Sequence, residues 1–220
     1  MKGDANLAAA NIKKDVEIFG VTGTFTTTIY PAAVPKTGQT TCYDASGNTV
    51  TCANTGQDGE LQKGVDLPSP RFTDNSDGTV TDNLTGLIWL KNANCVNATK
   101  NWTDSLTFAN TLFDGSTSHN NGDCELSDNS NAGNWRLPNR FELESLINLG
   151  YFDPTLSNTA GTGKWTDGEP FTSVQSNRYW SSTTLSNGSS DGWYVDLDDG
   201  LVGSNGKTDS YYVWPVRGGQ

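Results

Sequence analysis

Short runs in which apolar and polar residues alternate dominate this chain, and such runs predict β-strands. VEIFGVTGTFTT (16–27) predicts a strand or hairpin near the N-terminus. RFTDNSDGTVTDNLTGLIWLKN (71–92) predicts a hairpin that turns at Asp77-Gly78 and whose second strand ends in the apolar run 87–90. From residue 178 onward we expect only short strands, in YWSSTT, GWYVDLDDG and YYVWPVR, with turns at Asn187-Gly188, Asp199-Gly200 and Asn205-Gly206.

Two stretches place their apolar residues at helical spacing instead. In NWTDSLTFANTLF (101–113) the helix is capped by Asn101 or Thr103, and its apolar positions are Leu106, Ala109, Leu112 and Phe113. In WRLPNRFELESLINLGY (135–151) Asn139 and Glu142 have the spacing of a capping box, and Gly150 is the expected stop. The apolar stripe of this second helix is Leu143, Leu146 and Ile147. The expected core residues are Trp135, Leu137, Leu143, Leu146 and Trp180.

The pattern divides the chain into three parts. Residues 1–36 are an accessory β segment that ends in the linker YPAAVPK, and 37–66 hold a cysteine-flanked hairpin and a polar linker. Residues 67–220 form the main domain, which is long enough to bury a core of its own.

Composition and charge narrow the classes of partner. Only 34% of the residues are apolar, and the abundant Gly, Asn, Ser, Thr and Asp suit short strands joined by turns. The net charge of -11 disfavours nucleic acids, anionic lipids and sulfated polysaccharides. A basic protein, a cation or a neutral ligand fits this charge better.

The four cysteines are spaced unlike the ligands of a zinc site. Cys42 and Cys52 flank a predicted Ser-Gly-Asn turn, and a hairpin there brings the two thiols opposite each other. Cys95 and Cys124 then form the second disulfide, and free buried thiols are the alternative. Disulfides indicate an oxidising location: extracellular, on a cell surface or on a virion.

The N-terminal residues MKGDANLAAANIKKD lack the apolar core of a signal peptide, and no run of about eighteen apolar residues occurs. We therefore expect no membrane insertion. Either a leader has been removed, or the protein leaves its cell by another route, such as within a virus particle.

An aspartate cluster, DNSDGTVTD, is the first candidate for chemistry. Asp74, Asp77 and Asp82 resemble the oxygen ligands of a calcium loop, but the spacing and the terminal Glu of an EF-hand are missing. The same aspartates are equally suited to capping a hairpin turn. His119 lies in a polar loop without a catalytic partner motif, so we expect it at the surface.

A second acidic cluster comprises Asp196, Asp198 and Asp199. Asp196 and Asp198 share one face of the predicted strand. Paired carboxylates can act as acid and base, but a solvated edge that faces a ligand is the better interpretation. Because Trp193 and Tyr194 alternate, we expect Trp193 to pack inward and Tyr194 to be displayed.

Four sequence blocks occur in a fixed order: DNSDGTVTDNLTGLIWLKNANC, NWRLPNRFELESLI, YWSSTT and VWPVRGG. Together they resemble the DUF1566 domain, or Legionella collagen-like protein C-terminal domain, over about 68–220. NIKKDVEIFGVTGTF is similar to a short segment that often precedes this domain. The resemblance implies an α+β, C-type-lectin-like fold: two helices packed on a small, mainly antiparallel sheet with long loops, here preceded by a small β-rich segment.

The resemblance also bears on chemistry. Formylglycine-generating enzymes share this general fold, but their reactive cysteines lie near a C-terminal site, whereas all four cysteines here lie earlier. We therefore expect no enzyme. Calcium-dependent lectins use motifs such as EPN or WND, whereas Glu169-Pro170 is followed here by Phe171. No cofactor is expected, with calcium the one alternative.

The same domain type occurs in variable proteins of diversity-generating retroelements, which rewrite adenines at the 3′ end of a gene. The stretch 186–214 is rich in the Ser, Asn, Asp, Gly and Tyr that such rewriting produces. Solvated hairpin loops have the same composition, so both interpretations stay open. The framework positions in and around this stretch are Trp180, Trp193, Gly200, Val213, Val216 and Arg217.

These observations predict a non-enzymatic, ligand-binding protein of receptor or adhesin type, with a diversified surface and an origin on a virus or cell surface. The alternative is a structural or oligomerising appendage domain with a constant binding face. The expected ligand-binding residues are Asn187, Ser190, Asp191, Tyr194, Asp196, Asp198, Ser204, Asn205, Asp209, Tyr212 and Trp214.

Overall fold

The computed structural model describes residues 17–18, 21–22, 34–116 and 124–218. The chain divides into two compact units, 1–34 and 35–220. In the first unit β1 (Glu17–Ile18) pairs antiparallel with β2 (Val21–Thr22), which agrees with the strand pairing expected there. Most of the accessory segment and its linker, together with His119, lie outside the described residues.

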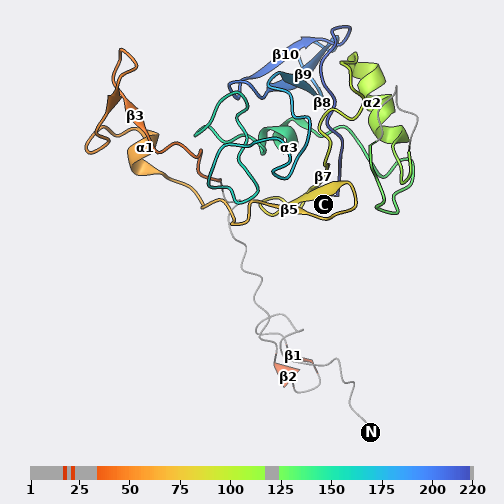
Figure 1. Ribbon diagram of the computed structural model, residues 1–220, viewed down its shortest axis with the longest axis horizontal. Coiled ribbons are helices and arrows are strands. Elements are labelled where there is room, and N and C mark those ends of the chain that lie inside the picture. Colours follow the sequence, from red (N-terminus) through yellow and green to blue (C-terminus); the bar gives the residue numbers. More distant parts are fainter. Residues whose placement is uncertain (1–16, 19–20, 23–33, 117–123, 219–220) are drawn as a thin grey trace. The chain divides into compact units, whose positions relative to one another are not determined.

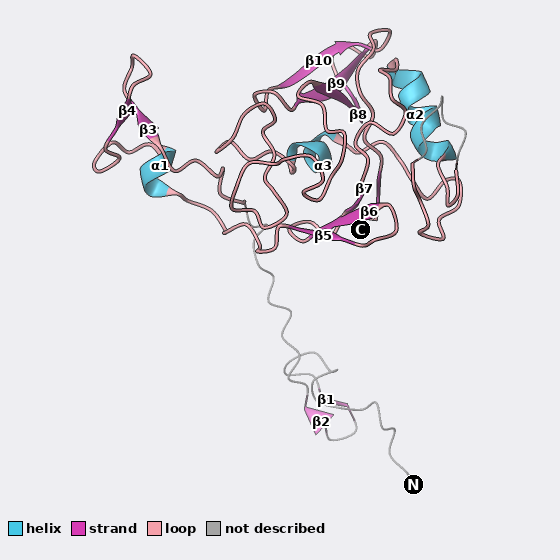
Figure 2. Ribbon diagram, viewed as in Figure 1, coloured by secondary structure: helices cyan, strands magenta, loops and turns pink. Residues whose placement is uncertain are grey.

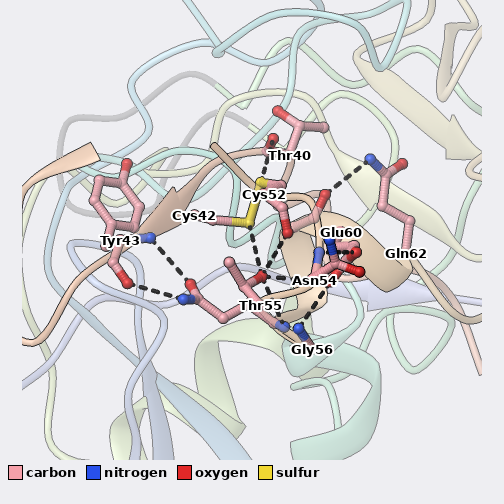
Figure 3. Close-up of a disulfide and its surroundings, with 11 residues drawn as sticks. Thr40, Cys42, Tyr43, Cys52, Asn54, Thr55, Gly56, Glu60 and Gln62 are labelled. Atoms are coloured by element: carbon pink, nitrogen blue, oxygen red, sulfur yellow. Dashed lines mark hydrogen bonds between the residues drawn. A yellow bond between two sulfur atoms is a disulfide. The ribbon is translucent and has the colours of Figure 1, made fainter. Parts of the chain in front are cut away.

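The second unit begins with a disulfide-closed hairpin. β3 (Cys42–Tyr43) pairs antiparallel with β4 (Thr49–Val50), and the bond between Cys42 and Cys52 closes the hairpin as expected (Figure 3). Gly47 has a φ of 83°, and Asp44 accepts hydrogen bonds from the backbone amides of the turn, so the predicted turn is confirmed. The short helix α1 (Asp58–Leu61) follows and was not predicted.

A four-stranded antiparallel sheet contains both ends of the main domain. Its strand order is β11-β7-β6-β5, with β5 (Phe72–Asp74), β6 (Thr79–Asp82), β7 (Ile88–Leu90) and β11 (Val216–Arg217). The turn between β5 and β6 contains Gly78 at a φ of 82°, as predicted. The apolar run 87–90 was expected to end the second strand of the hairpin, and this prediction is wrong. A tight turn at 83–86 follows β6, and the run then contributes a separate strand, β7.

Helix α2 (Trp102–Thr111) begins where the sequence predicted. The side chain of Asn101 accepts a hydrogen bond from the backbone amide of Asp104 at 2.9 Å, which fixes Asn101 as the N-cap. Ala109 and Leu112 are buried, whereas Phe113 is exposed. The bond between Cys95 and Cys124, whose Cα atoms lie 5.2 Å apart, is the predicted second disulfide.

Helix α3 (Arg140–Glu144) has the predicted capping box of Asn139 and Glu142 but is shorter than expected. It ends at Glu144, and the amides of Leu146 and Ile147 then donate to carbonyls only three residues earlier. The two amides that follow bind other segments of the chain. The amide of Asn148 donates to the carbonyl of Thr155, and that of Leu149 donates to the carbonyl of Thr37. The prediction that Gly150 stops the helix is therefore wrong.

A three-stranded antiparallel sheet, in the order β10-β9-β8, carries five of the eleven predicted binding residues on its strands. Its strands are β8 (Arg178–Thr184), β9 (Asp191–Asp196) and β10 (Val202–Gly206). Strand β10 was not predicted, and the expected turn at Asn205-Gly206 is wrong because these residues end that strand. The turns at Asn187-Gly188 and Asp199-Gly200 are confirmed.

The core of this unit is aromatic and continuous. Trp89, Trp135, Trp180 and Trp214 are all fully buried, and every expected core residue is buried. Figure 1 shows α3 between the two larger sheets, and Figure 2 shows that loops make up most of the chain here. The unit is thus α+β, with few helices and small antiparallel sheets. None of the described helices has the length and apolar character needed to cross a membrane.

Candidate binding site

The predicted binding residues differ widely in exposure. Asn187, Ser190, Asp198 and Asp209 are exposed, whereas Tyr194 and Trp214 are buried. The remaining five are partly buried: Asp191, Asp196, Ser204, Asn205 and Tyr212. A single displayed surface therefore does not contain all eleven residues.

Trp214 has no exposed surface, so its assignment to a ligand-binding surface is wrong. Its indole Nε1 donates to the Leu90 carbonyl at 2.8 Å. Its ring contacts Phe171 edge to face, with centroids 4.9 Å apart, and also contacts Trp89 and Tyr179. The segment 213–216 is buried throughout, so simple alternation does not apply to it.

Tyr194 and Trp193 have the opposite roles to those expected. Tyr194 is only 7% exposed and contacts Tyr211, whereas Trp193 is half-buried and lies under the guanidinium of Arg140. Both faces of β9 are covered, one by α3 and the other by the segment that contains Tyr211. Displaying Tyr194 to a ligand would require this second cover to move, so its assignment as a surface residue is corrected.

A polar pocket of about 350 Å³ gathers three of the predicted residues. Asp196 and Asp198 come from the end of β9 and the turn that follows, and Tyr212 comes from the segment before β11. Its remaining lining residues are Thr99, Ser176, Asn177, Arg178, Ser210 and Tyr211. Asn187 and Ser190 do not line it, because they lie in the turn between β8 and β9.

Arg178 is the central cation of this pocket. Its Nε donates to the Asp196 carboxylate at 3.3 Å, and its Nη1 donates to the Tyr211 hydroxyl at 3.2 Å. The same hydroxyl accepts a hydrogen bond of 2.6 Å from Asn205. The hydrogen bond with Tyr211 raises the pKa of Arg178 above its ordinary value. The guanidinium is therefore charged and held in one orientation.

Other polar groups of the pocket are uncommitted. Throughout the part of the chain that the structure describes, the Asp198 carboxylate has no hydrogen-bond or salt-bridge partner. The same is true of the hydroxyls of Thr99, Ser176 and Ser210. The pocket thus combines a fixed frame of Arg178, Asp196 and Tyr211 with groups that are free to bind a ligand.

Arg178 and Tyr211 were missed by sequence reasoning, although one signal was present. In the antiparallel register of β8 and β9, Arg178 lies directly opposite Asp196. Opposite charges at paired positions stabilise such a register. If YWSSTT is paired with GWYVDLDDG and extended by the one residue that precedes it, Arg178 falls opposite Asp196.

The aspartates of the first cluster, Asp74, Asp77 and Asp82, cap turns. This is the alternative to a calcium loop that the sequence left open. Asp74 accepts from the amide of Ser76, and Asp77 accepts from the amide and hydroxyl of Thr79. Asp82 accepts from Leu84 and forms a buried ion pair with Arg71. Within the described ranges, no group of three or more His, Cys, Asp or Glu side chains is arranged to hold a metal ion.

The chain matches a known protein family over more than half of its length. The family model described as the Lcl C-terminal domain matches residues 78–217, which is well over half of the chain. The matched range contains the polar pocket, all strands from β7 to β11 and both longer helices. No curated protein matches the chain.

Proposed function

Because the chain belongs to the Lcl C-terminal domain family, we propose that it is a non-enzymatic, ligand-binding protein of receptor or adhesin type, whose ligand occupies the polar pocket. One observation carries the proposal: uncommitted groups of Asp198, Ser176 and Ser210 surround a pocket whose cation, Arg178, is already held in place. A frame fixed before binding lowers the entropy cost of association.

A binding role fits this chemistry better than catalysis. Asp196 is tied to Arg178, and Asp198 is exposed to solvent. A general acid or base near neutral pH normally owes its altered pKa to burial or to a like charge close by. The salt bridge instead holds the side chains of Arg178 and Asp196 in a fixed orientation, which favours steady recognition of a ligand.

The scaffold we propose is C-type-lectin-like. In support, β5 at the start of the main domain and β11 at its end belong to one antiparallel sheet. α2 and α3 both contact the second sheet through β8. The long loops that this arrangement leaves are suited to carrying a site, because loops tolerate substitution better than the elements that hold them.

Retroelement-directed diversification of the surface is a further part of the proposal. In the stretch 186–212, the turn before β9 and the turn after it are exposed, and so is the segment 208–210. Trp180, Val195 and Val216 have no exposed surface. Exposed substitutions usually change stability by less than about 0.5 kcal/mol, so these turns can vary while the fold persists.

The proposed location is outside the cytosol, on a cell surface or virion. The two disulfides fit such a location, because thiols are kept reduced in most cytosols. The acidic surface fits a partner that is not a nucleic acid.

The test is a binding screen with a pocket-blocking variant. The full chain is presented to a random peptide library displayed on phage and to a printed glycan array. We expect selected binders to be lost in Ser210→Trp, which fills the pocket, and retained in Thr208→Trp, an exposed site that does not line it. Binders that are insensitive to Ser210→Trp, or no binders at all, would overturn the proposal and favour a structural appendage.

A further inference from the structure

Three large apolar side chains are exposed around the turn that follows β9. Leu149 is 41% exposed, Phe152 74% and Leu201 50%. We call these three residues the turn patch. Exposed apolar residues that gather at one place, unlike scattered ones, indicate an interaction site.

Two contacts place the turn patch beside the polar pocket. A Cβ built on Gly200 would lie 2.8 Å from Cδ2 of Leu149, so Leu149 touches the turn that contains Leu201. The amide of Asp153, next to Phe152, donates to the carbonyl of Asp198 at 2.8 Å. Asp198 lines the pocket, so the patch and the pocket adjoin at this residue.

The charge around this combined site is negative. Asp153, Asp196, Asp198 and Asp199 lie in or beside the turn. Arg178 in the pocket is engaged by Asp196 and Tyr211, and Lys164 lies over the ring of Phe152 at 5.5 Å. The free carboxylate of Asp198 and the net charge of -11 favour an incoming cation.

The walls of the pocket suit an ammonium or guanidinium group. Hydroxyls of Thr99, Ser176 and Ser210 can accept hydrogen bonds from such a group, and the carboxylate of Asp198 can pair with it. Tyr211 and Tyr212 supply aromatic rings that attract cations. An anionic ligand would meet the uncompensated carboxylate instead.

From this arrangement we propose that the ligand is a basic segment of a partner protein. A lysine or arginine side chain enters the pocket beside Asp198, and an adjacent apolar side chain packs on the turn patch. This rests on the proposed function of the pocket and adds the chemistry of its occupant. Charge complementarity gives the segment its orientation, and the apolar contact excludes water around it.

The experiment uses the full chain and a random twelve-residue peptide library displayed on phage. We expect enriched peptides to carry a lysine or arginine within three positions of a large apolar residue. Synthetic copies should bind at least tenfold more weakly when the basic residue is replaced by norleucine. Their affinity should also fall as salt concentration rises, because charge pairs are screened.

Matched variants separate charge from fold. Asp198→Asn should lower the affinity for the peptides at least tenfold, and Leu201→Ala should lower it several-fold. Asp66→Asn removes an exposed carboxylate that pairs with Lys36 and does not line the pocket, and should leave affinity within twofold. Melting curves of all three variants should match that of the unmodified chain, since the changed side chains are exposed.

Two results would overturn the inference while leaving the proposed function intact. In one, the enriched peptides lack basic residues, or they bind the Asp198→Asn variant as tightly as the unmodified chain. In either case they no longer bind the Ser210→Trp variant. In the other, only glycans bind, and their binding requires an open pocket. If no selected binder depends on the pocket, the proposed function fails along with the inference.

Discussion

Trp193 and Tyr194 are consecutive residues of β9 that meet arginines on opposite faces of the sheet. The guanidinium of Arg140 lies 4.5 Å from the centroid of the Trp193 ring, and that of Arg178 lies 4.9 Å from the centroid of Tyr194. Arg140 belongs to α3, whereas Arg178 belongs to the polar pocket. The face that carries Tyr194 is therefore the face that supports the polar pocket.

Trp214→Ala should destabilise the fold rather than affect binding alone. The change removes a fully buried indole, its hydrogen bond to Leu90 and its contacts with Trp89 and Phe171. Comparable truncations cost about 3–5 kcal/mol. For a domain of this size that lowers Tm by roughly 10 °C.

Thermal unfolding followed by circular dichroism measures this, with Asn187→Ala as the control. Asn187 is exposed, so its replacement should change stability by less than about 0.5 kcal/mol. Equal melting temperatures for the two variants would contradict the buried position of Trp214.

Gly200→Ala tests how closely the turn after β9 packs against the loop that contains Leu149. Gly200 has a φ of 82°, and an added Cβ would lie 2.8 Å from Leu149 and 3.1 Å from Ile147. Gly86 has a similar φ of 72°, but among the described residues nothing lies within 4 Å of its added Cβ.

Gly86→Ala should therefore cost about 1 kcal/mol, from backbone strain alone. Gly200→Ala should cost at least about 1 kcal/mol more, because the crowded side chains must also shift. Chemical denaturation of both variants gives the comparison. Similar losses would mean that the turn is not packed against Leu149 as described.

Sequence signals that act over a few residues predicted much of this fold. Asn101 and Asn139 cap helices through their own side chains, and Gly78 supplies a backbone conformation that few other residues adopt. These features need no distant partner, so the sequence reveals them. The hairpin around Cys42 and Cys52 was predictable for the same reason.

Features that depend on distant segments were missed. Beyond α3 the amides of Asn148 and Leu149 donate to carbonyls in other loops, so the chain does not continue as a helix to Gly150. No local pattern encodes these bonds. Strand β10 has five partly buried residues and no alternation, so only its pairing with β9 defines it. Such pairing joins residues that neither propensity nor periodicity connects.

The residues of the polar pocket were predicted only in part, for the same physical reason. Asp196, Asp198 and Tyr212 were identified as polar or aromatic residues near turns, and the pocket contains all three. Arg178 and Tyr211 were missed because their role depends on the β8–β9 register. Trp214 was wrongly predicted to lie at the surface, because the extended segment that contains it is buried on both faces.

Peptide mapping without reduction should find Cys42 linked to Cys52 and Cys95 linked to Cys124. In each pair the Cα atoms lie 5.2 Å apart, within the usual range for a disulfide. Mass spectrometry after alkylation of the unreduced protein gives the readout, with a reduced sample as the control. Four alkylated thiols in the unreduced sample would rule out both bonds.

If retroelements diversify this protein, the source genome should contain a near-copy of the gene's 3′ end close by. Differences should be confined to adenines of that copy and should fall in codons for exposed residues, such as 187–190, 198–199 and 208–210. Codons for Trp180, Val195, Trp214 and Val216 should be spared, because these side chains are fully buried. Sequencing this locus provides the measurement, and the absence of any copy would leave a constant binding site.

The most direct test of the polar pocket is nuclear magnetic resonance of the full chain, titrated with a peptide or glycan from the binding screen. We predict that the largest amide shift changes cluster at residues that line the pocket: Ser176–Arg178, Asp196, Asp198 and Ser210–Tyr212. Changes clustered instead around Phe141 and Trp193, or along the groove between Leu106 and Arg136, would mean that the ligand does not bind in the polar pocket.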